Sequence, residues 1–219
     1  MQKGKVYIKK WREDYDFKTV INSSVSTLIT LAFALYNGIL GVLHASVWHG
    51  SICVYYVLLT AARAVIVLTE KNNLKRAEEV ASVHRRHTFI ICSSLLFVLN
   101  LSLAVPVALM VELKRPIHMG LIPAIAMAAY TTYKVSLASV NLKRKNASAN
   151  LLVRQLRAIG FIDALLSIIT LQNTLITVKL GETGASMLRL SAMSSTAILL
   201  VINALTIVTF FKGIRGERR

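Results

Sequence analysis

The longest uncharged stretch of the chain, residues 19–62, contains no Asp, Glu, Lys or Arg in 44 residues. A helix needs about 20 apolar residues to cross a hydrocarbon core roughly 30 Å thick, so this stretch is long enough for two crossings. Its middle, residues 44–51, combines Trp, His and Gly, which suit a membrane interface and a tight turn. The stretch therefore predicts two membrane helices joined by a short turn, at residues 20–43 and 51–69.

Four further apolar runs follow, each long enough for one membrane helix. We expect these helices at residues 87–111, 117–141, 152–178 and 186–211. The chain is 55% hydrophobic and 16% charged, whereas soluble domains are roughly 45–50% apolar with about 25% charged residues. The sequence predicts an all-α polytopic membrane protein, a single domain over residues 1–219 built as a bundle of about six transmembrane helices. Pro106 lies inside the third run and should kink that helix or end it early.

The basic residues lie mostly on one side of this arrangement. If six helices alternate in direction, one side holds 20 Lys and Arg residues, in the segments 1–18, 70–86, 143–157 and 212–219. The other side holds 4, in the segments 43–50, 112–118 and 179–189. Because short cytoplasmic loops of membrane proteins are enriched in Lys and Arg, we expect both termini in the cytoplasm and the protein in the plasma membrane.

The formal net charge of +16 has the same explanation. In a soluble protein such an excess would favour a nucleic-acid partner, but here it collects at the predicted cytoplasmic ends of the helices. Each basic residue near an anionic membrane surface contributes about 1 kcal/mol to binding. We expect the lipid bilayer, with anionic lipid at the cytoplasmic face, as the main partner. A partner protein or a second copy of the chain is a further one, and nucleic acid is not expected.

Three charged residues fall well inside the predicted spans: Arg63, Lys134 and Asp163. Charges inside a membrane are costly and usually functional. With a helical rise of about 1.5 Å per residue, Arg63 lies about 10 Å, Asp163 about 9 Å and Lys134 about 13 Å from the nearest cytoplasmic flanking charge. Two cations and one anion at similar depth predict an interhelical cluster. Alternatively, the two long cationic side chains extend to the nearby interface, which the short Asp163 side chain cannot do.

Polar residues also follow one helical face in three of the predicted spans. Ser167 and Thr170 follow Asp163 at four and seven residues in the fifth span. A similar stripe in the first span consists of Ser23, Thr27, Thr30, Ala34, Asn37, Gly41 and His44. The sixth span has a third stripe, made of Arg189, Thr196 and Asn203. Such stripes could line a path for a solute or an ion, although small and hydroxyl residues more often serve helix packing.

No catalytic or metal-binding motif is visible. The sequence has no zinc-protease pair, GxSxG or P-loop, and Cys53 and Cys92 lie in separate apolar runs without a CxxC motif. We expect no metal and no cofactor, and no family resemblance emerges from the motifs. Tyr130 and Tyr133 lie close to Lys134 and could form a cation–π site, although such tyrosines more often anchor or pack a helix.

The sequence leaves two main functional hypotheses. The first is a small-solute or ion transporter or channel-type protein, with a polar site in the cytoplasmic half formed by Asp163, Arg63, Lys134, Ser167, Thr170 and Asn37. The second is a non-catalytic membrane subunit or scaffold whose basic cytoplasmic face docks a partner protein or anionic lipid. An intramembrane enzyme is the least favoured class, because no catalytic constellation is visible. A water-accessible cavity at Asp163 would favour the first hypothesis, and a closed, dry bundle the second.

Reporter fusions test the six-span arrangement. Fusions at Trp48, Arg115 and Glu182 should report an outside location, because each position lies on the side with few basic residues. Fusions in the segments 70–86 and 143–157 should report the cytoplasm, and they serve as the matched controls. A cytoplasmic signal at Glu182 would rule out six alternating spans.

Overall fold

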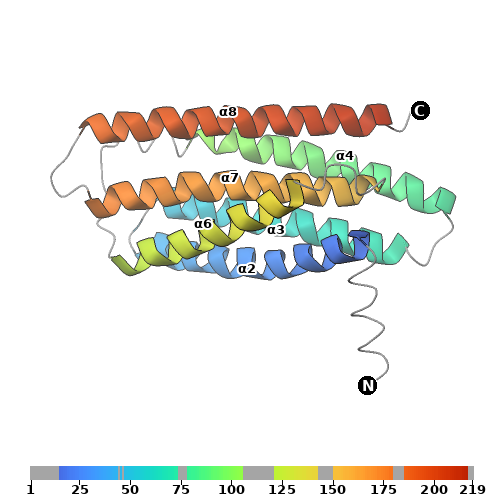
Figure 1. The fold of residues 1–219 in the computed structure, drawn as a ribbon, viewed down its shortest axis with the longest axis horizontal. Helices are drawn as coiled ribbons and strands as arrows, with labels where there is room; N and C mark the ends of the chain where they lie inside the picture. The colour runs from blue at the N-terminus through green and yellow to red at the C-terminus, as the bar shows by residue number, and fades with distance from the viewer. Residues whose placement is uncertain are drawn as a thin grey trace, which may run out of the picture.

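The computed structural model describes residues 15–43, 45, 47–73, 78–105, 121–142, 150–179 and 185–216, and these parts are helical apart from short connections (Figure 1). The helices are α2 (Tyr15–Leu43), α3 (Val47–Asn73), α4 (Glu78–Ser102), α6 (Leu121–Leu142), α7 (Leu151–Lys179) and α8 (Ala185–Gly216). Each overlaps one of the six predicted spans. The all-α fold class predicted from the apolar runs is therefore confirmed for the described residues.

The largest difference from the predicted ranges occurs at α4. This helix begins at Glu78 rather than at residue 87, because the charged segment before the apolar run is itself helical. It ends at Ser102 rather than at residue 111. Residues 104 and 105 are again helical, and Pro106 lies outside the described residues, so the expected kink or early end at this proline stays a prediction.

Four of the described helices are long and apolar enough to cross a membrane: Ile21–Leu43, Val47–Asn73, Leu151–Ile176 and Arg189–Arg215. The other two are α4 and α6. In α4 the first half is polar and contains Arg85 and Arg86, while α6 carries Lys134 among several hydroxyl side chains. The number of spans beyond four, and the side on which the termini lie, remain predictions.

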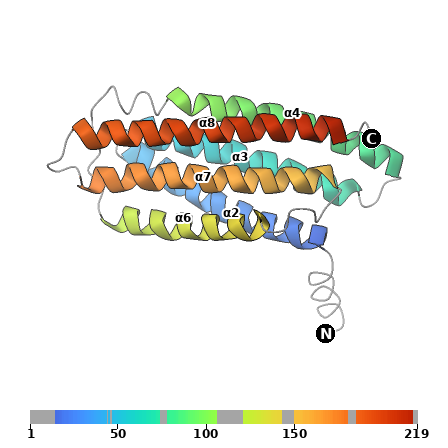
Figure 2. The same cartoon turned by 45° about the horizontal axis from the view of Figure 1, so that its top comes forward.

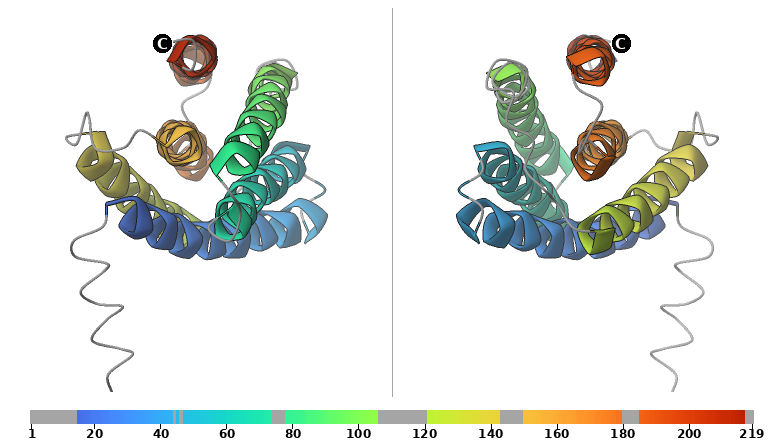
Figure 3. Two further views of the ribbon diagram at one scale, coloured as in Figure 1. Left: turned by 90° about the vertical axis from the view of Figure 1, so that its right-hand side faces the viewer. Right: turned by 90° about the vertical axis from the view of Figure 1, so that its left-hand side faces the viewer.

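The helices pack around α7, with α8 running along it and α6 crossing it obliquely (Figure 1). This helix packs against α2, α3, α4, α6 and α8. In the end-on views α7 lies in the middle, with α8 on the far side from α2 and α3 (Figure 3). Among the described helices, α8 packs against α4 and α7 alone, and the turned view shows α8 running along α4 (Figure 2). The most central position in the fold therefore belongs to the helix that carries Asp163.

The bundle has an apolar exterior and many polar side chains inside. Large aliphatic side chains such as Leu28, Val42 and Ile122 are 68%, 83% and 81% exposed, respectively. Buried polar or charged side chains occur on all six helices. A protein in water buries its apolar groups instead, so this distribution is compatible with an integral membrane protein, whose outer surface meets lipid.

Neutral hydrogen bonds join the helices in pairs. Tyr55 of α3 donates to the Asn100 carbonyl of α4 at 2.8 Å, and the Asn100 amide donates to Thr206 of α8 at 2.9 Å. Gln155 of α7 donates to Ser93 of α4 at 3.0 Å. Such contacts between membrane helices contribute about 0.6 kcal/mol each. They connect α4 and α8 to the rest of the bundle without any buried charge.

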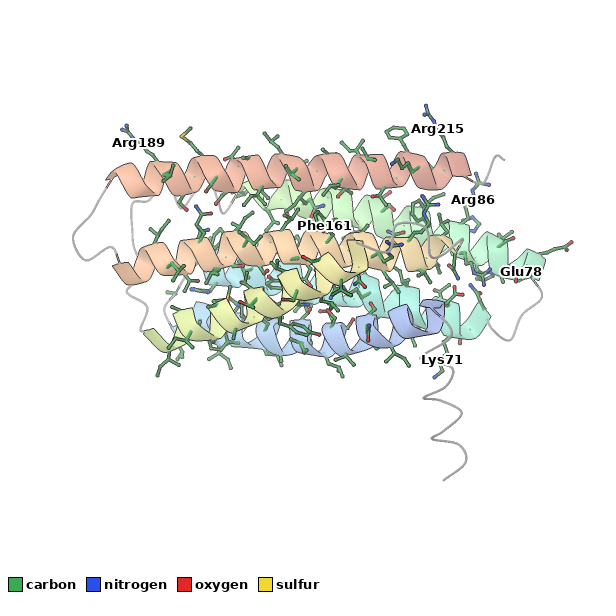
Figure 4. All side chains as sticks on the ribbon, in the orientation of Figure 1. Lys71, Glu78, Arg86, Phe161, Arg189 and Arg215 are labelled. Carbon is green, nitrogen blue, oxygen red and sulfur yellow. The ribbon has the colours of Figure 1, made fainter. Side chains whose placement is uncertain are left out.

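Arg85 forms ion pairs with Glu70 and Glu78 at the end of the bundle where α3 ends and α4 begins. Lys71, Glu78 and Arg86 mark this end in Figure 4. The Arg85 guanidinium donates two hydrogen bonds to Glu70, both 3.2 Å long, and one to Glu78 at 2.7 Å. The hydrogen bonds to Glu70 are the main cause that raises the pKa of Arg85. Asn150 donates to the same Glu70 carboxylate at 2.8 Å and caps the start of α7 by accepting from the Leu152 amide. This network fixes α3, α4 and α7 relative to one another.

Gly213 tests the packing of α8 on α4. A Cβ atom at this position would lie 2.2 Å from the Phe89 ring, which is 2% exposed and cannot turn away. Overpacking of this kind costs about 1–3 kcal/mol, so Gly213→Ala should lower the unfolding temperature of the detergent-solubilised protein. Gly160→Ala is the matched control, because nothing lies within 4 Å of its Cβ position. It should be neutral or stabilising by up to about 1 kcal/mol, and equal effects at both positions would contradict this packing.

Candidate polar site within the bundle

The three charged residues predicted inside the spans meet in the interior of the bundle. Arg63 comes from α3, Lys134 from α6 and Asp163 from α7, and their side chains are 1%, 2% and 0% exposed. The depths counted from the sequence therefore agree with a real interhelical contact. The alternative in which Arg63 and Lys134 extend to the interface is wrong, because both cations point to the same buried carboxylate.

One carboxylate oxygen receives both cations. Asp163 Oδ2 lies 2.8 Å from Arg63 Nη2 and 2.6 Å from Lys134 Nζ. These distances are those of charge-assisted hydrogen bonds, which are about twice as strong as neutral ones. The other oxygen, Oδ1, accepts a longer bond of 3.3 Å from the Tyr130 hydroxyl. The Asp163 carboxylate thus accepts from one donor on α3 and two donors on α6, and the shorter bonds are those to Oδ2.

Two hydroxyls of α2 complete the surroundings of the cations. Ser26 Oγ accepts from Lys134 Nζ at 2.9 Å and from Arg63 Nη1 at 3.2 Å. Thr30 Oγ1 accepts from the same two groups at 2.6 and 3.2 Å. The single hydroxyl proton of Thr30 goes to the Ser26 carbonyl at 2.8 Å, so its 3.4 Å contact with Asp163 is weak. α2 therefore supplies acceptors to the cations rather than charge.

Aromatic rings line the side of the cluster next to α2 and α3. The Tyr130 ring stacks on Phe33 with centroids 4.1 Å apart, and Tyr56 meets both rings edge-on. Lys134 Nζ lies 5.2 Å from the Tyr130 ring centroid. The cation–π contact considered from the sequence is present for Tyr130, and the same ring also packs, so the two roles are combined in one residue.

The other three residues expected in the site lie outside the cluster. Ser167 and Thr170 are buried on the same helix as Asp163, but their hydroxyls donate to carbonyls of their own helix. The Asn37 amide donates to the Phe33 carbonyl, and its own carbonyl oxygen lies 3.0 Å from His49 Nδ1. These contacts fit the alternative interpretation of the stripes, in which hydroxyl and amide side chains serve helix packing. A role of these three residues in a path stays a prediction.

The stripe expected on the sixth span faces the interior only in part. Arg189 and Thr196 are exposed, whereas Asn203 is half-buried and its Oδ1 is buried. α8 has no close backbone contact with α2, α3 or α6 among the described residues. The predicted path built from the first, fifth and sixth spans together is therefore wrong in its neighbours, because α3 and α6, and not α8, lie beside α2 and α7 at the charged cluster.

One member of the cluster, Ser26, was missed in the sequence. It lies four residues before Thr30, on the buried face that continues through Phe33 and Asn37. The predicted stripe of the first span contained Thr30 and Asn37 but ran through Ser23 and Thr27 instead of Ser26. The i, i+4 spacing to Thr30 is the signal that could have found it. Tyr130 was considered only as a cation–π partner of Lys134, and its hydrogen bond to Asp163 was not expected.

Among the described residues the cluster holds no activated nucleophile. The hydroxyls of Ser26 and Thr30 receive hydrogen bonds from cations, and no described histidine contacts them, so neither has a base to activate it. Among the described residues no three His, Cys, Asp or Glu side chains gather as a metal site would require. No protein-family model, curated protein or solved structure matches the chain.

Neutralising Asp163 tests the charge pairing. Asp163→Asn keeps the side-chain shape but leaves Arg63 and Lys134 as two adjacent buried cations. Breaking a buried ion pair in this way costs on the order of 3–5 kcal/mol. The variant should therefore unfold at a markedly lower denaturant concentration in detergent micelles.

Lys134→Gln is the matched control, because it leaves a neutral Arg63–Asp163 pair and should cost much less. Combining Asp163→Asn with Lys134→Gln should recover part of the lost stability, since a single buried cation then remains. An Asp163→Asn variant as stable as the wild type would show that the carboxylate carries a proton or binds a transported cation instead of the two side chains.

Proposed function

We propose that this chain is a small-solute or ion transporter or channel-type protein of the plasma membrane, with both termini in the cytoplasm. Its polar site is the cluster of Arg63, Lys134, Asp163, Ser26 and Thr30. The observation that carries the proposal is the complete burial of three charged side chains from three different helices, inside a bundle whose exterior is apolar.

The energetics of buried charges support a functional role for the cluster. Removing charged groups from water costs several kcal/mol per ion, and apolar residues of similar volume often stabilise a core equally well or better. Three buried charges are therefore weak candidates for a purely structural element. Charged side chains inside membrane bundles typically mark the pathways of ions, protons or substrates.

The second candidate is a non-catalytic subunit or scaffold that docks a partner protein or anionic lipid. It is favoured by exposed basic side chains near one end of the bundle, including Lys71, Arg86 and Arg215 (Figure 4). Exposed positive charges at one end of the bundle are attracted to an anionic lipid surface. In this alternative the buried charges only fix the helices relative to one another, and the site never meets water.

Cysteine accessibility distinguishes the two candidates. With Cys53 and Cys92 replaced by Ala, Ser26→Cys places a thiol in the cluster. A transport site must open to water at some stage, and thiols react as thiolates, which form in water and not in lipid. A membrane-impermeant methanethiosulfonate reagent should therefore modify Ser26→Cys in reconstituted vesicles, from the side on which Lys71→Cys reacts.

The control is Leu28→Cys, two residues further along the same helix. Leu28 is 68% exposed on the apolar exterior, so its thiol should face lipid and react slowly. The measured quantity is the ratio of the two modification rates. If Ser26→Cys stays unmodified from both sides while Lys71→Cys reacts, the site is closed to water and the transport proposal fails in favour of the scaffold.

A further inference from the structure

The charges of the cluster do not balance. Arg63 and Lys134 bring two positive charges, and Asp163 brings one negative charge. The other buried acid among the described residues, Glu70, is held by Arg85 and Asn150 at the end of the bundle. The remaining groups that bond to the cluster are uncharged: the hydroxyls of Ser26, Thr30 and Tyr130 and the Ser26 carbonyl. Within the described part of the chain, the site is one negative charge short.

The Arg63 guanidinium also lacks an acceptor. Its Nη2 donates to Asp163, and its Nη1 donates to Ser26 and Thr30. Its Nε is buried and has no hydrogen-bond partner. Buried donors without a partner cost free energy and are rare in folded proteins. The two hydroxyl oxygens already receive bonds from both cations, so the site lacks an acceptor as well as a negative charge.

We propose that the missing group is a small monovalent anion, and that a halide or a carboxylate is the class of solute this site binds. This inference rests on the proposed function and names its substrate class. A monovalent anion would bring the cluster to neutrality, whereas a cation would add to the uncompensated charge. Guanidinium and ammonium groups together form the donor set that proteins use to hold such anions.

Direct binding tests this assignment. The purified protein in detergent is equilibrated with radiolabelled chloride, with radiolabelled acetate, or with radiolabelled sodium. Saturable binding of chloride or acetate, and none of sodium, is the expected result. Chloride alone would assign a halide site, and acetate alone a carboxylate site. Saturable sodium binding without either anion would overturn the proposal.

Charge-matched variants connect the binding to the cluster. Lys134→Gln leaves a neutral site and should weaken anion binding by at least about tenfold, because close buried charge pairs have large coupling energies. Adding Asp163→Asn to Lys134→Gln restores a net charge of +1 and should restore binding. Lys71→Gln removes an exposed cation by the same substitution and should leave binding unchanged. Equal losses in Lys134→Gln and Lys71→Gln would place the anion elsewhere.

The binding and accessibility experiments can fail independently. If Ser26→Cys reacts with the aqueous reagent but wild-type protein binds neither anion, the site opens to water and the anion assignment is wrong. If an anion binds, in a manner that depends on Lys134, while Ser26→Cys never reacts, the anion is a fixed part of the bundle. In that case the anion site is supported and the transport proposal fails.

Discussion

A single carboxylate holds the centre of the bundle together. Asp163 Oδ2 is shared by an arginine of α3 and a lysine of α6, and both cations reach on to hydroxyls of α2. Because a buried charge must be paired or solvated, none of α3, α6 and α7 can shift far without leaving a charged group unpaired. A shift of α2 would remove hydrogen-bond acceptors from both cations. Lys134 has a particular part in this, since α6 and α2 have no close backbone contact and its long side chain spans the distance between them.

α7 meets its neighbours through charged groups on one face and through neutral groups on another. Asp163 faces α2, α3 and α6, while Gln155 and Asn173 bond to α4 and α8 through uncharged groups. In lipid, helices associate through close packing and hydrogen bonds rather than through the hydrophobic effect. Away from the Arg85–Glu70 ion pair at the end of the bundle, the packing of α4 and α8 accordingly relies on amide and hydroxyl pairs and on the close approach of Gly213 to Phe89.

The apolar runs of the sequence predicted six helices and their approximate bounds, because length and hydrophobicity decide where a helix can lie in lipid. Counting residues from the flanking charges was enough to place Arg63, Lys134 and Asp163 at one level. Neither approach says which helices are neighbours. The sixth span was therefore placed beside the first, although α8 and α2 have no close backbone contact, and Ser26 was missed although its helix was correctly predicted. Periodicity shows which residues share a face, and only the packing shows what that face meets.

An ion pair between Arg63 and Asp163 alone would be enough to fix two helices of the bundle relative to each other. That pair is neutral, and its hydrogen bonds to α2 would already connect a third helix. Lys134 adds a second buried cation, with its own desolvation cost, to a carboxylate that was already paired. Its ammonium also lies against the Tyr130 ring rather than beside another acid. The excess positive charge is thus the feature that a structural role explains least well, and it is the feature that an anion-binding site requires.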